Sequence, residues 1–109
     1  NTMDFNAEVK RKYSYLTDED AVAIVNRAKW FYYNALYPAD LSADETTRPI
    51  KGFRQQQWIL AACDEIVERN GISSATAYSE NGVRMEFDNS QISEGLLSQL
   101  KPMIGVVGK

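Results

Sequence analysis

The chain has 109 residues, of which 44% are hydrophobic and 25% are charged, and this composition is typical of one folded domain and too apolar for a disordered protein. Its formal net charge of −3 argues against nucleic-acid binding, because that affinity comes largely from Lys and Arg side chains that neutralise phosphates. Histidine is absent and Cys63 is the single cysteine, which excludes an intramolecular disulfide and a cysteine metal site and removes the commonest general base.

We next consider whether the sequence contains a membrane-spanning or targeting segment. No stretch approaches the roughly 20 apolar residues of a membrane-spanning helix, and the first residues lack the charged-then-apolar pattern of a signal peptide, so we expect neither a span nor a signal peptide. We therefore expect a reducing cytoplasm, or a particle assembled in one, as the compartment. Because Asn1 and Thr2 precede Met3, we expect the native start to lie near Met3.

The N-terminal part of the sequence predicts two helices. The shorter one, over residues 3–15, would turn inward the side chains of Phe5, Val9 and Tyr13. The longer one, over residues 18–37, begins after the capping residue Thr17, has three acidic residues in its first turn and stops at Pro38. Its apolar face consists of Ala21, Ile24, Val25, Ala28, Phe31, Tyr32, Ala35 and Leu36.

Residues 38–52 are predicted to form a loop, because two prolines, a glycine and several Asp, Ser and Thr residues leave no periodicity. A connection of this length inside one domain usually indicates function or mobility. The next helix is expected over residues 53–70, before Gly71. Its buried stripe contains Ile59, Leu60, Cys63, Ile66 and Val67, and its polar side contains Gln57, Asp64, Glu65 and Glu68.

The apolar period then changes from 3.6 to 2. Residues 75–88 alternate around Asn81-Gly82, a strong turn signal, and predict a β-hairpin. Ser93 is the expected cap of a short helix over residues 93–100, and residues 102–109 form an apolar tail that we expect to be extended. The predicted fold is mainly α: one domain with a small bundle of three to four helices, one β-hairpin and an extended C-terminal tail.

The acidic residues and the single cysteine give little indication of a catalytic site. The acidic residues 18–20 are explained by capping and the helix dipole, and Asp64, Glu65 and Glu68 by a solvated helix face. Cys63 lies in the buried stripe, and no histidine is available to activate it. No Gly-rich phosphate loop occurs. We therefore predict a protein that is not an enzyme and has no metal or cofactor.

Aromatic and apolar residues outside the predicted core are more informative. Trp30, Tyr33 and Tyr37 form a second stripe on the long helix, which is covered either by the N-terminal segment or the hairpin of the same chain or by a partner subunit. Trp58 lies off the stripe of its own helix and contacts either the long loop or a partner. The tail adds to the chain's own hairpin or to a neighbour's sheet edge, and we favour the neighbour. The predicted interface residues are Trp30, Tyr33, Tyr37, Trp58, Ile104, Val106 and Val107.

An ordered set of segments resembles a known family. The set begins with YLTDED at residues 15–20 and continues with WILAACDEIVER at 58–69 and NGI at 70–72. It ends with YSENGV at 78–83, QISEGLL at 91–97 and LKPMI at 100–104. The chain is similar in these segments to the head–tail connector, or head-completion, proteins of long-tailed bacteriophages and prophages. Residues 38–52 match that family poorly.

The resemblance implies a structural role in virion assembly. Such proteins form a ring, expected to be twelve-fold, under the portal protein in the neck between head and tail, and they are assembled in the bacterial cytoplasm. The ring extends the DNA channel and presents a surface to the next neck or tail protein, while the genome passes through without sequence-specific binding. The family has no catalytic residues to transfer to this chain.

Three other functions compete with this interpretation. A helix-turn-helix regulator has a turn of 3–4 residues between its helices, whereas residues 38–52 separate the two long helices here. A small enzyme using carboxylates alone would need two acids that converge in a deep cleft. A generic helical protein–protein binding module, such as an antitoxin or adaptor, is compatible with the same sequence features.

Overall fold

The computed structural model describes residues 4–70, 74–80 and 92–100. The protein is mainly helical, as predicted, and no strand occurs among the described residues. The helices are α1 (Phe5–Lys12), α2 (Asp18–Leu36), α3 (Phe53–Arg69), α4 (Ala75–Glu80) and α5 (Glu94–Leu97). No helix in this part of the chain is long and apolar enough to cross a membrane.

Side-chain caps mark where α1, α2 and α5 begin, and α4 has a similar contact described below. The Asp4 carboxylate accepts a hydrogen bond from the backbone N–H of Ala7 at the start of α1. The hydroxyls of Thr17 and Ser93 accept the corresponding bonds at α2 and α5, as the sequence predicted. The α2 helix ends one residue before the predicted limit, and the backbone N–H of Tyr37 closes its last turn.

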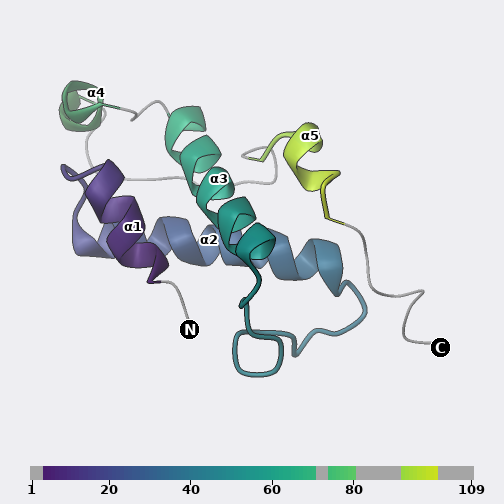
Figure 1. The fold of residues 1–109 in the computed structure, drawn as a ribbon. Helices are drawn as coiled ribbons and strands as arrows, with labels where there is room; N and C mark the ends of the chain where they lie inside the picture. Colours follow the sequence, from purple (N-terminus) through teal and green to yellow (C-terminus); the bar gives the residue numbers. More distant parts are fainter. Residues whose placement is uncertain (1–3, 71–73, 81–91, 101–109) are drawn as a thin grey trace.

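The first three helices pack together and form the core. Each of them contacts the other two, and α1 and α3 both cross α2 in Figure 1. Phe5 and Val9 of α1 and Tyr13 just after it are buried, as predicted, and so are Phe31 and Tyr32 of α2. The apolar stripe of α3 supplies the opposite wall, where the least exposed side chains are Ile59, Ala62, Cys63, Ile66 and Val67. Burial of such aliphatic side chains is the main stabilising contribution to the fold.

The prediction of a β-hairpin over residues 75–88 is not supported. Its first arm is the helix α4, and residues 81–88 lie outside the described residues. The helix is favoured because the Ser74 hydroxyl accepts a hydrogen bond from the backbone N–H of Ala77, at 3.2 Å, and so satisfies one donor of the first turn. Figure 1 shows α4 to one side of the three packed helices.

Candidate interaction surface

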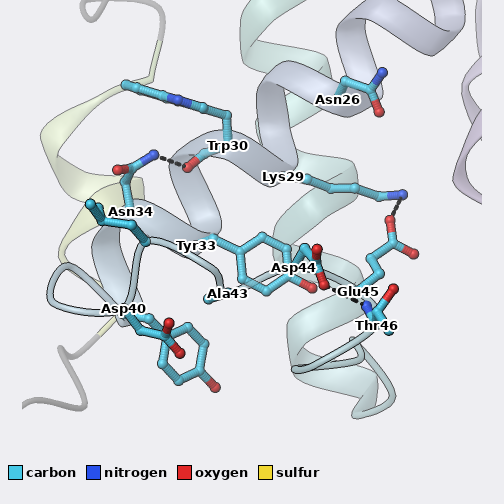
Figure 2. A pocket seen from close by; sticks show the side chains of 12 residues that line it. Asn26, Lys29, Trp30, Tyr33, Asn34, Asp40, Ala43, Asp44, Glu45 and Thr46 are labelled. Carbon is cyan, nitrogen blue, oxygen red and sulfur yellow. Dashed lines mark hydrogen bonds and ion pairs between the residues drawn. The ribbon is translucent and has the colours of Figure 1, made fainter.

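The aromatic residues predicted on the outer side of α2 lie in three different environments. Trp30 is 45% exposed, Tyr33 is buried and Tyr37 is half-buried. The rings of Tyr33 and Tyr37 stack with their centroids 6.2 Å apart. The loop between α2 and α3 covers part of this stripe (Figure 2), whereas the sequence predicted the N-terminal segment, the hairpin or a partner as its cover.

The loop is held on α2 by polar and cation–π contacts. The Tyr33 hydroxyl donates a hydrogen bond to the carbonyl oxygen of Arg48 at 2.7 Å, and Lys29 forms an ion pair with Glu45. The guanidinium group of Arg48 lies over the Tyr37 ring, 4.8 Å from its centroid. Burial, followed by the negative charge of Glu45, raises the pKa of Tyr33 above its ordinary value. This hydroxyl therefore stays protonated and remains a donor at neutral pH.

The loop is also bonded to itself. The Asp40 carboxylate accepts hydrogen bonds from the backbone N–H and the hydroxyl of Ser42, at 3.1 and 2.7 Å, and lies 3.6 Å from the Arg48 guanidinium. These hydrogen bonds, with a smaller contribution from Arg48, lower the pKa of Asp40. The Asp44 carboxylate accepts a bond from the backbone N–H of Thr46 at 2.8 Å. Such turns are the usual role of Asp in loops, and they fix the shape of this one.

A groove of 610 Å³ lies between α2 and the loop. Figure 2 shows Trp30, Tyr33 and Asn34 on the helix side, and Asp40, Asp44 and Glu45 on the loop side. Leu41 also lines the groove and is 94% exposed. Apolar and charged side chains are therefore mixed along one open depression.

Trp30 is exposed but held in place. The Arg27 guanidinium lies 4.3 Å from the centroid of its ring, and the ring of Phe31 meets it edge-on at 5.2 Å. Aromatic and cation–π contacts of this kind restrict the rotation of the side chain. The protein thus presents a large apolar ring to solvent in a fixed orientation.

Trp58 lies inside the subunit. Only 4% of its surface is exposed, its indole N–H donates to the carbonyl oxygen of Leu96 at 2.8 Å, and its ring centroid lies 6.0 Å from that of Tyr32. Its cover in this chain comes from α5 and α2, whereas the sequence predicted the loop or a partner. The residue connects α3 to α5 and contributes little to the exposed surface.

Two acidic residues assigned from the sequence to a solvated face have structural partners instead. The Glu65 carboxylate accepts hydrogen bonds from the backbone N–H and the hydroxyl of Ser93, at 2.7 and 3.0 Å. Asp64 accepts bonds from the Lys12 ammonium at 2.8 Å and from the Tyr13 hydroxyl at 3.0 Å. The first pair attaches α5 to α3, and the second attaches α1 to α3. Local sequence holds no signal for either, since the partners lie 28 and about 52 positions away.

Cys63 and Asp18 have ordinary structural environments. Burial raises the pKa of the Cys63 thiol to about 12, so the thiolate that nucleophilic chemistry requires is suppressed. The carboxylate of Asp18, at the start of α2, lies 3.3 Å from the Lys10 ammonium. In the described part of the chain, no group of three Cys, Asp or Glu side chains is placed to hold a metal ion.

Replacing Tyr33 with phenylalanine is expected to lower the free energy of unfolding by about 1 kcal/mol at neutral pH, because the Arg48 carbonyl loses its donor. The folded-state pKa of Tyr33 is raised, so the contribution of the protonated hydroxyl is complete below about pH 10 and is lost as the pH rises through the folded pKa. Urea denaturation between about pH 8 and 11 measures this, and the free energies of unfolding of the wild-type and Tyr33→Phe proteins should converge above about pH 10. A constant difference would contradict this role.

The other predicted interface residues, Ile104, Val106 and Val107, lie outside the described residues. Trp30, Tyr33 and Tyr37 are brought together at the groove, and Trp58 is not among them. Arg48 and Leu41 contribute to the same surface, although neither was among the predicted interface residues. No family model, curated protein or solved structure matches the chain significantly.

Proposed function

We propose that the protein is a structural subunit of a bacteriophage neck, which forms a ring under the portal and joins the head to the tail. The observation that carries the proposal is the ordered set of connector-like segments between residues 15 and 104. Two of these segments correspond to the start of α2 and to most of α3, which are parts of the packed core. The segment at residues 78–83 adds less than expected, because its first three residues belong to α4 and form no strand.

The surface of α2 supports an assembly role. A fixed, exposed Trp30 beside a groove with an exposed Leu41 is an arrangement that interfaces use, since Trp is enriched in interface hot spots and apolar anchors fill their centres. A ring subunit needs two different faces for its two neighbours, a heterologous contact that closes by rotation. The net charge of −3 suits a channel wall, which must let DNA pass without holding it.

A generic protein-binding module is the second candidate, and the same groove favours it equally. A helix-turn-helix regulator fits less well, because residues 37–52 separate α2 from α3. The binding module and the connector differ in one measurable property. Only the connector has the portal ring as its specific partner.

The test is electron microscopy and mass photometry of the purified chain mixed with the portal ring of the same phage or prophage. We expect stoichiometric decoration of one end of the portal, or rings of the chain alone. A portal ring from an unrelated phage is the matched control and should remain undecorated. If the chain does not bind its own portal even at high concentration, the connector proposal is wrong and the protein-binding module becomes the better supported function.

A further inference from the structure

The groove between α2 and the loop has both an apolar and an electrostatic character. Its large exposed apolar side chains are Trp30 and Leu41. Its charged lining consists of three carboxylates, Asp40, Asp44 and Glu45, and one ammonium group, Lys29. Lys29 pairs with Glu45 and Arg48 with Asp40, whereas no ion pair of Asp44 is found among the described residues. The groove therefore favours a ligand that brings apolar side chains and a positive charge.

One segment of the sequence has this composition. Residues 101–109, KPMIGVVGK, contain two lysines, no acidic residue and the apolar side chains Met103, Ile104, Val106 and Val107. Nine residues span at most roughly 30 Å, which is enough to leave one subunit and cross a groove on the next. Apolar side chains could meet Trp30 and Leu41 while a lysine meets the Asp44 carboxylate.

We propose that residues 101–109 of one subunit bind in the groove between α2 and the loop of a second copy. This inference rests on the proposed function, because it names the contact between neighbours in the ring. The groove and the segment are different parts of one chain, so their contact is heterologous and propagates from copy to copy until it closes. The lysine contact makes the association weaker at high salt, as for any exposed charge pair.

The test uses two defective partners, each of which lacks one half of the contact. Trp30→Glu in the full chain damages the groove and keeps the segment, and a chain ending at Leu100 keeps the groove and lacks the segment. In sedimentation velocity each should be a monomer alone, and their mixture should form a dimer that grows no further. A mixture that stays monomeric overturns the proposal, and so does a chain ending at Leu100 that associates as the full chain does.

Additional variants separate the contact from the stability of the fold. Leu41→Asp, at a 94% exposed position, should weaken the mixed dimer about tenfold. Asp44→Asn keeps the hydrogen-bond acceptor of the loop and should reduce the dependence of the association on salt. Val22→Glu is the matched control for Trp30→Glu, since Val22 is also an exposed apolar residue of α2 but does not line the groove. Equal effects of the Val22 and Trp30 variants would overturn the assignment to the groove.

The two proposals fail separately. If the mixed dimer forms and the portal stays undecorated, the groove contact is supported and the connector function is disproved. If the portal is decorated and the mixture stays monomeric, the connector stands and the groove contact falls. A third outcome is that a synthetic KPMIGVVGK peptide binds the truncated chain, while the full chain is monomeric and does not bind the peptide. This outcome would show that the segment occupies the groove of its own chain, and it would overturn the contact between copies.

Discussion

Replacing Trp58 with alanine is expected to lower the free energy of unfolding by about 3–5 kcal/mol. The substitution removes a 4% exposed indole from the junction of α2, α3 and α5, together with the hydrogen bond to the Leu96 carbonyl. The loss combines the transfer of a large aromatic group, the cavity that it leaves and an unsatisfied backbone acceptor. Urea denaturation followed by circular dichroism measures it without relying on tryptophan emission.

The matched control for this substitution is Trp58→Phe. Phenylalanine keeps most of the buried ring and loses the N–H, so the expected loss is about 1–3 kcal/mol, smaller than for alanine. A loss below about 1 kcal/mol for Trp58→Ala would contradict the buried position of this side chain. Equal losses for the two variants would place the whole effect in the hydrogen bond.

Replacing Glu65 with alanine is expected to cost about 2–3 kcal/mol, because its carboxylate accepts two hydrogen bonds from Ser93. Ser93 caps α5, so its hydroxyl and backbone N–H both lose an acceptor when the carboxylate is removed. The measurement is again urea denaturation. Glu68→Ala is the matched control on the same helix, at an exposed position, and should change stability by less than about 0.5 kcal/mol.

A double-mutant cycle isolates this contact from the general effect of losing a charge. If Glu65 and Ser93 act on each other, the loss in Glu65→Ala/Ser93→Ala should be smaller than the sum of the single losses. Additive losses would mean that the two residues stabilise the protein independently. That result would disprove the attachment of α5 to α3 through this pair.

The helical core could be predicted from the sequence because its signals are local. Thr17 caps α2 through a bond to a residue three positions away, and Pro38 lies two residues after the end of the helix. The spacing of Phe5, Val9 and Tyr13 placed all three on one buried side. Caps, breakers and apolar spacing depend on neighbours within one or two turns, so they survive without knowledge of the tertiary structure.

The prediction for residues 75–80 was wrong for a physical reason. Alternation over a few residues near Asn81-Gly82 indicates a strand, but so short a pattern is compatible with a helix as well. The capping contact from Ser74 to Ala77 and two alanines with high helix propensity favour the helix. These contributions outweigh the preference for a strand, because a two-stranded hairpin is only marginally stable without further packing.

The candidate surface was predicted only in part. The spacing of Trp30, Tyr33 and Tyr37 identified the face of α2, because it follows from helix geometry alone. The covering loop could not be predicted, since the bond from Tyr33 to Arg48 and the pairing of Lys29 with Glu45 depend on how an irregular segment folds back. Trp58 was ambiguous for a similar reason: its acceptor, Leu96, lies 38 positions away.

The hydrogen bonds within the loop have a thermodynamic consequence for any ligand of the groove. Asp40 and Asp44 fix their turns, and Tyr33 fixes the far end of the loop, before anything binds. Ordering a backbone residue costs about 1–2 kcal/mol of conformational entropy. For the loop, which forms one wall of the groove, this entropy is lost when the subunit folds and not when a ligand binds. A flexible segment that docks there loses only its own freedom. A site whose wall is ordered in advance binds a ligand more tightly than the contact area alone suggests.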